Sequence, residues 1–394
     1  MHILIIHQAF AAINEPGGTR HHELARHLVQ RGHRVTIIAS PVSYLTGAAA
    51  AHEETLEDGI KIIRAYVYTA HNKSFVHRVF AFISFMISSF VAGLRVKNVD
   101  LVWGTSPPIF QAVTAWLLAR IKRVPFLLEI RDLWPAFAIA VGVLTNKPLI
   151  AASQWLERVL YRNADRVMVN SPGFIDHVTD LGAQRVELVP NGADVRMFDS
   201  VSQADAQPRS SSAYRVLYAG AHGMSNDLGV VLDAAKLLED ENVEIALLGD
   251  GKEKANLQAR AQELALKNVV FLPSVPKSEM AAVLADTDAC LAILKPIEMY
   301  KTTYPNKVFD YMAAGKPQVL AIDGVSRDVV DAAGCGVFAE PGNPQALADG
   351  IMTLAKDPVR SREMGLAGRV YIEEHFDRSA LAEKLVMILE EMVS

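Results

Sequence analysis

The segment Tyr304–Pro317, YPNKVFDYMAAGKP, carries the residues best suited to binding a phosphorylated ligand. Pro305 suits the first position of a helix, where its missing N–H group costs nothing. Asn306 and Lys307 then fall in the first turn, whose N–H groups have no partner within the helix, and a lysine there could neutralise a diphosphate without a metal ion. Asp310 shares the helix face of Lys307, and its carboxylate could accept two ribose hydroxyls. The alternative is an amphipathic helix with a solvated Lys–Asp pair.

Two glycine-rich loops each precede an expected helix. Gly17 and Gly18 follow the first expected strand, and Gly220 and His222 follow the first strand of the second half. Glycines let a backbone approach a bulky anion, and a helix N-terminus attracts negative charge. The first loop could equally be an ordinary tight turn, and His222 could either donate to a phosphate or only cap its loop. A third segment, 249–251, is interpreted as a plain turn.

The elements that must position these residues alternate between short apolar runs and amphipathic helical patterns. Such alternation predicts an α/β protein with doubly wound parallel sheets, whose ligands bind at the carboxyl ends of the strands. The polar segment Asp199–Ser212 is interpreted as a linker, after which the alternation starts again. We therefore expect two domains, residues 1–195 and 196–378, with a final helix at 379–394 that packs back on the first.

Composition is typical of a folded protein in a reducing compartment. Hydrophobic residues make up 51% of the 394 residues, which excludes general disorder. The two cysteines, in apolar surroundings, indicate neither a disulfide framework nor a zinc cluster. Met1–Gln8 lacks a basic leader and is interpreted as a buried strand, so a cytoplasmic location is expected. Residues 1–195 carry a net charge of +4 and the remainder −9, which either favours an anionic partner for the first half or has no functional meaning.

The segment Val79–Leu94 contains no charged residue, and Arg78, Arg95 and Lys97 flank it. It is short for a bilayer span, which needs about 20 residues. Three interpretations remain open: a helix on the inner face of a membrane with its basic flanks on anionic lipid, a buried crossover helix, or a transmembrane helix.

The chain resembles the retaining glycosyltransferases of family 4, which have the GT-B fold of two Rossmann-like domains facing a central cleft. Over nearly the whole length, five segments resemble the motifs of that family in order and spacing: Val189–Asp194 with Phe198, Leu247–Gly251, Val269–Val275, Ala285–Asp288 and Lys307–Pro317. The GGT-x3-ELA block from Gly17 and the block Glu129–Pro135 most resemble a subgroup that builds surface polysaccharides, such as N-acetyl-fucosamine transferases.

The resemblance implies that the second domain holds a nucleoside diphosphate-sugar, expected to be UDP-linked, and the first domain the acceptor. Asp310 would bind the ribose hydroxyls, and the backbone at Ser274 and Val275 would lie along the edge of the nucleotide base. The diphosphate would be surrounded by Lys307, Gly17, Gly18 and the loop of Gly220 and His222. The transferred sugar would be faced by one continuous stretch, namely Thr302, Thr303, Tyr304, Pro305 and Asn306.

Three departures from the family pattern are visible. Thr302 stands where the family has glutamate, which leaves the sugar-facing role open. No arginine or lysine follows the first strand of the second domain, where many members of the family bind the diphosphate. His222 and Lys307 must therefore provide more of the contacts to the diphosphate. Arg131 precedes Asp132 where the family has histidine before aspartate. Arg131 could hold a donor or acceptor phosphate or make a structural salt bridge, and Asp132 could orient the acceptor or cap a helix.

No Asp-x-Asp metal motif follows a suitable strand, which predicts a metal-independent transfer. The resemblance to family 4 implies retention at the anomeric carbon. Lys307 and Arg131 would stabilise the departing diphosphate. No further cofactor and no nucleic-acid partner are expected. The acceptor would be a glycan or a polyprenyl-diphosphate-linked sugar. The alternatives are a sugar-nucleotide epimerase of the same architecture and a non-catalytic nucleotide-sugar-binding protein.

Overall fold

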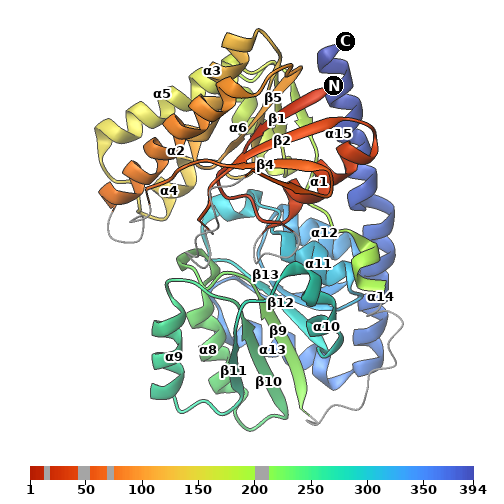
Figure 1. Ribbon diagram of the computed structural model, residues 1–394. Helices are drawn as coiled ribbons and strands as arrows, with labels where there is room; N and C mark the ends of the chain where they lie inside the picture. Colours follow the sequence, from red (N-terminus) through yellow and green to blue (C-terminus); the bar gives the residue numbers. More distant parts are fainter. Residues whose placement is uncertain (13–17, 43–53, 69–74, 200–212) are drawn as a thin grey trace. The chain divides into compact units, whose positions relative to one another are not determined.

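The computed structural model describes residues 1–12, 18–42, 54–68, 75–199 and 213–394 (Figure 1). Two compact units divide the chain between Pro190 and Asn191, slightly before the boundary expected at residue 195, and the segment Ser379–Ser394 belongs to the first unit. Gly17 and all of the expected linker except Asp199 lie outside the described residues.

The first unit contains an eight-stranded sheet in the order β3-β4-β2-β1-β5-β6-β7-β8. All neighbours pair in parallel except β3 and β4. Its central strands are uniformly buried, as expected where helices cover both faces of a parallel sheet. The strands are β1 (His2–Ile6), β2 (Arg34–Ala39), β3 (Glu54–Glu57), β4 (Ile60–Arg64), β5 (Leu101–Ser106), β6 (Phe126–Ile130), β7 (Arg166–Val169) and β8 (Val186–Leu188). The helices are α1 (Arg20–Gln30), α2 (Phe75–Arg95), α3 (Ile109–Lys122), α4 (Ala136–Ala140), α5 (Lys147–Asn163) and α6 (Ile175–Asp180).

The second unit contains a six-stranded, wholly parallel sheet in the order β11-β10-β9-β12-β13-β14. The prediction of two doubly wound α/β domains is therefore confirmed. The strands are β9 (Tyr214–Ala219), β10 (Val243–Leu248), β11 (Val269–Leu272), β12 (Ala289–Ile293), β13 (Gln318–Ala321) and β14 (Gly336–Phe338). The helices are α8 (Leu228–Leu237), α9 (Lys254–Glu263), α10 (Met280–Ala285), α11 (Asn306–Ala313), α12 (Val325–Ala333), α13 (Pro344–Lys356) and α14 (Pro358–His375).

The last helix, α15 (Arg378–Val393), completes the core of the first unit. Leu381, Leu385 and Leu389 are buried there with residues of β1, β2 and α1, including Ile5 and Leu28. The first unit is thus built from two stretches of chain separated by the whole second unit.

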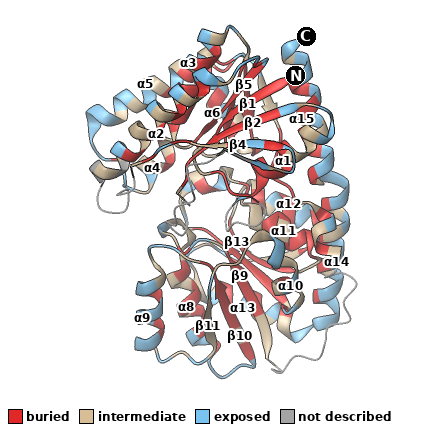
Figure 2. Ribbon diagram, viewed as in Figure 1, coloured by how far each residue is buried: buried red, intermediate tan, exposed pale blue. Residues whose placement is uncertain are grey.

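The helix α2 has two different faces (Figure 2). Its inner face is buried at Ala81, Phe85 and Ser89 and packs along α3. The outer face carries four half-exposed apolar side chains in one stripe, which are Phe80, Ile87, Val91 and Leu94. The uncharged segment is therefore not a fully buried crossover helix. Among the described helices, none is long and apolar enough to cross a membrane.

Replacing Leu385 by alanine should destabilise the first unit by about 2–5 kcal/mol, because a fully buried side chain leaves a cavity. Met387→Ala is the matched control, since that side chain is 58% exposed on the same helix, and it should change stability by less than about 0.5 kcal/mol. All four tryptophans belong to the first half of the chain, so urea unfolding followed by tryptophan fluorescence reports on this unit. Equal losses for both variants would contradict the assigned packing.

Candidate functional site

The loop after β9 is held against the loop after β10. The Gly220 N–H donates to the Leu248 carbonyl at 3.0 Å, and the His222 N–H donates to the Asp250 carbonyl at 2.8 Å. Gly249 has φ +139°, and any side chain on it would clash with the Gly220 carbonyl. Gly249 thus permits a close approach of two backbones at the carboxyl edge of the sheet, rather than only making a turn.

Lys307 lies directly against this loop. It is in the first turn of α11, and a Cβ on Gly220 would be 2.8 Å from the lysine Nζ. The Nζ atom is buried, lies 3.7 Å from the centroid of the Tyr218 ring and has no hydrogen-bond partner among the described residues. Burial lowers the pKa of Lys307 to about 7, because the charged form loses its hydration. The structure thus brings Lys307 and Gly220 together.

His222 is a second buried group without a partner. Its side chain is inaccessible to solvent, and neither ring nitrogen has a hydrogen-bond partner among the described residues. Burial, together with the nearby charge of Lys254, lowers the pKa of His222 to about 4. The ring is therefore neutral near pH 7, with one nitrogen able to donate and the other to accept.

The stretch before α11 adds further buried polar atoms. The Thr303 hydroxyl and the Asn306 side-chain oxygen are both buried without a partner in the described residues. Buried polar groups in folded proteins are almost always hydrogen-bonded, so several such atoms beside a buried cation indicate a place for a polar ligand.

The other residues of this stretch have structural contacts. The Thr302 hydroxyl donates to the Met299 carbonyl at 2.6 Å. The Tyr304 ring is buried against Phe309 and Phe376, and burial raises the pKa of its phenol to about 12. Pro305 is the residue before the helix, not its first residue, so α11 begins at Asn306.

Asp310 is paired with a lysine that the sequence did not single out. Its Oδ1 atom makes a salt bridge with the Nζ atom of Lys277. Nearby, both the N–H and the hydroxyl of Ser274 donate to the Asp250 carboxylate. Val275, which directly follows Ser274 in the chain, is partly buried.

The first unit has a different kind of buried cluster around Glu129. Arg20 and His21 bind its two oxygens at 3.0 and 2.6 Å, and the Trp103 indole donates at 3.2 Å. Burial alone would raise the pKa of Glu129, but the charges of His21 and Arg20 and the hydrogen bond from His21 hold it well below its usual value. Sequence reasoning missed this cluster, although the motif blocks that contain Arg20 and Glu129 were its signal.

Arg131 and Asp132 follow β6, at the carboxyl edge of the first sheet. The Arg131 side chain donates to the Pro107 carbonyl at 3.2 Å, and its Nε atom is buried without a partner in the described part of the chain. Burial raises the pKa of Asp132 to about 7, although the charge of Arg131 acts in the opposite direction. Gly18, before α1, is exposed. No group of His, Cys, Asp or Glu side chains suited to a metal ion occurs in the described ranges.

Solved structures share this two-unit arrangement. Sucrose-phosphate synthase from Thermosynechococcus elongatus has a TM-score of 0.80 at 16% identity, with 99% of this chain and 98% of that chain covered. Anabaena Alr3699/HepE, in complex with UDP and glucose, has a TM-score of 0.73 at 18% identity, with 98% and 99% covered. The fold is therefore that of two-domain α/β glycosyltransferases.

The sequence comparisons identify the domains. Residues 17–192 match the glycosyl transferase 4-like domain, and residues 203–370 match the glycosyl transferases group 1. A protein of Escherichia coli K12 named as a colanic acid biosynthesis glycosyl transferase, WcaI, is 24% identical over 385 residues, which is 92% of this chain and 93% of the relative. The chain is therefore a glycosyltransferase enzyme, whose first part matches the glycosyl transferase 4-like domain and whose second part matches the glycosyl transferases group 1.

Proposed function

We propose that this enzyme transfers a sugar from a nucleoside diphosphate-sugar, most simply a UDP-sugar, to a glycan or lipid-linked acceptor during surface polysaccharide synthesis. The observation that carries the proposal is the buried Lys307 ammonium at the start of α11, which lies beside the loop of Gly220 and has no partner in the described part of the chain. A diphosphate would supply its missing counter-charge. The HepE structure with bound UDP-glucose and the name of the WcaI relative support the donor class and the pathway.

In the proposed reaction the bond between the sugar and the diphosphate breaks, and negative charge develops on the leaving group. Lys307, a neutral His222 donating one N–H group and the free N–H groups at the start of α11 would stabilise that charge. Because they are held by packing before the donor arrives, little reorganisation is needed. We propose that the anomeric configuration is retained and that no metal ion takes part.

The acceptor is assigned to the first unit. Arg131 offers a buried N–H group at the carboxyl edge of the sheet, which suits an anionic acceptor such as a lipid-linked diphosphate. Asp132, with a pKa of about 7, would orient the attacking hydroxyl.

Lys307→Ala should reduce sugar transfer at least tenfold while leaving the far-UV circular dichroism unchanged, since one donor to a developing anion is worth about 10²–10³ in rate. The ammonium form binds the anion, and the pKa of the free group is about 7. Donor affinity of the wild type should therefore fall as pH rises above about 7, and the variant should lose this dependence. Unchanged turnover and unchanged donor affinity in the variant would reject the assignment.

Transfer by the wild-type enzyme should continue at its full rate in excess chelator, because the proposed scheme stabilises the diphosphate with Lys307, His222 and helix N–H groups alone. The measurement is product formation from the radiolabelled donor, before and after dialysis against chelator. Activity that requires added Mg²⁺ or Mn²⁺ would contradict the scheme.

The outer stripe of α2 supports a location at an anionic membrane face. Phe80, Ile87, Val91 and Leu94 are each between 43% and 58% exposed, and the exposed Arg95 and Lys97 follow at the end of the helix. A helix with exposed apolar and basic residues is suited to lie in the headgroup region, where a lipid-linked acceptor would be available.

The enzyme should float with vesicles that contain anionic lipid at low salt. Replacing Ile87 and Val91 together by glutamine should reduce the bound fraction about tenfold, since two half-buried aliphatic side chains contribute roughly 1–2 kcal/mol. Val359→Gln is the control, because that side chain is 73% exposed in the second unit. Absence of binding by the wild type, or equal effects of both changes, would refute the membrane assignment.

A further inference from the structure

Lys277 contacts Asp310, a predicted site residue of the second unit, although the sequence did not single out Lys277. It begins a short 3-10 helix, Lys277–Glu279, shortly after β11, and Pro276 precedes it. Its Nζ atom pairs with Oδ1 of Asp310, and the two side chains are only 12% and 17% exposed. An ion pair this sheltered from water is much less screened than a surface pair.

An aromatic ring fixes the lysine from another direction. The Nζ atom of Lys277 lies 5.5 Å from the centroid of the Phe198 ring, and Phe198 is completely buried. A cation over an aromatic face is attracted by the ring quadrupole. The ammonium is thus held between a carboxylate and a ring, and neither of these can move far.

We propose that Lys277 is a positioning residue for the nucleotide, which orients the Asp310 carboxylate toward the ribose hydroxyls. This inference rests on the proposed nucleoside diphosphate-sugar donor. The pair with Lys277 engages Oδ1 of Asp310, and we assign Oδ2 to accept hydrogen bonds from a ribose.

A second physical reason is the charge of the ligand. An isolated carboxylate beside a nucleoside diphosphate would repel it, and like charges at close range are costly. Lys277 neutralises the charge of Asp310, so the carboxylate can accept hydrogen bonds from the ribose hydroxyls without repelling the diphosphate. Lys277 therefore acts on the ribose end of the donor, whereas Lys307 acts on the diphosphate.

The test compares UDP and GDP with their 2′-deoxy counterparts by calorimetry on the full-length protein. The wild type should bind one ribonucleotide at least tenfold more tightly than its deoxy form. Lys277→Met keeps the length of the side chain but removes the charge. It should weaken binding of the ribonucleotide about tenfold and reduce the ribose preference, with kcat nearly unchanged and the donor KM raised.

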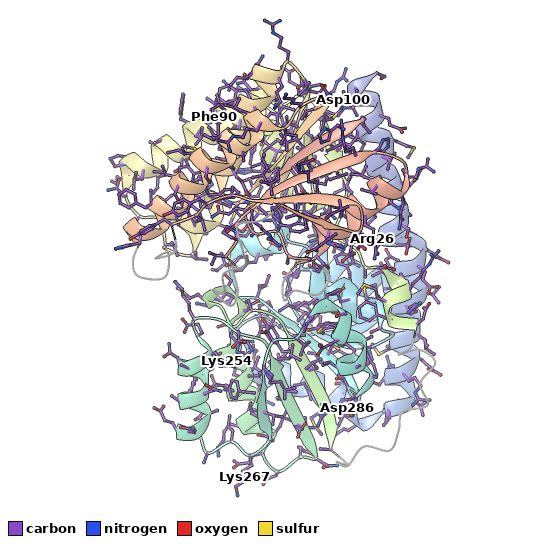
Figure 3. The ribbon with its side chains drawn as sticks, viewed as in Figure 1. Arg26, Phe90, Asp100, Lys254, Lys267 and Asp286 are labelled. Carbon is purple, nitrogen blue, oxygen red and sulfur yellow. The ribbon has the colours of Figure 1, made fainter. Side chains whose placement is uncertain are left out.

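Three further variants make the test specific. Lys277→Arg should restore affinity to within about threefold, and Lys277→Met combined with Asp310→Asn should be no weaker than Asp310→Asn alone, because the two residues act as one unit. Lys267→Met is the matched control, because Lys267 is exposed and lies at the lower end of the second unit in Figure 3.

The outcomes separate this inference from the proposed function. Unchanged or tighter ribonucleotide binding by Lys277→Met, with the ribose preference intact, would overturn the positioning role while leaving the donor class in place. If the wild type binds neither UDP nor GDP, the proposed donor is wrong and the role of Lys277 is rejected with it.

Discussion

In the second unit, the Nζ atom of Lys307 is buried without a counter-charge among the described residues. Removing a lysine ammonium from water is costly, and proteins usually compensate with a carboxylate. Here the compensation within the described residues is only the face of the Tyr218 ring. The glycines at 220 and 249 allow two loops to approach closely beside this position, and Lys307 lies in the first turn of α11. The unit stores an unfavourable interaction that an anion would relieve.

The cluster around Glu129 in the first unit shows the opposite arrangement. Its carboxylate is equally buried, but Arg20, His21 and Trp103 satisfy it. Arg20 also donates to the carbonyls of Val189 and Pro190 at 2.7 Å each. This cluster therefore ties the segment at Val189 and Pro190 to α1 and satisfies the Glu129 carboxylate, although Nδ1 of His21 has no partner among the described residues. Buried charge alone is therefore not evidence of a binding site, and the proposed site rests on a buried charge that has no partner among the described residues.

Much of the fold could be predicted from the sequence. The alternation of apolar runs and amphipathic helices indicated two parallel sheets, and the resemblance to family 4 implied that Lys307 and Gly220 lie around the same diphosphate. The partners of the charged residues could not be predicted in this way. Lys277 and Asp310, or Arg20 and Glu129, are far apart in the chain, and only tertiary packing decides which carboxylate each cation meets. The buried and exposed faces of α2 could not be predicted either. Apolar residues occur all around this helix, and their periodicity does not show which ones are covered by neighbouring elements.

The return of α15 to the first unit has a consequence for synthesis on the ribosome. Domains ordinarily fold in the order in which they are made. Here the strands β1 and β2 emerge first, but the leucines of α15 that cover part of their core are translated only after the entire second unit. The second unit can complete its core earlier, while the first exposes an apolar surface until α15 has been translated. In this enzyme the half that is made first is therefore the half that finishes folding last.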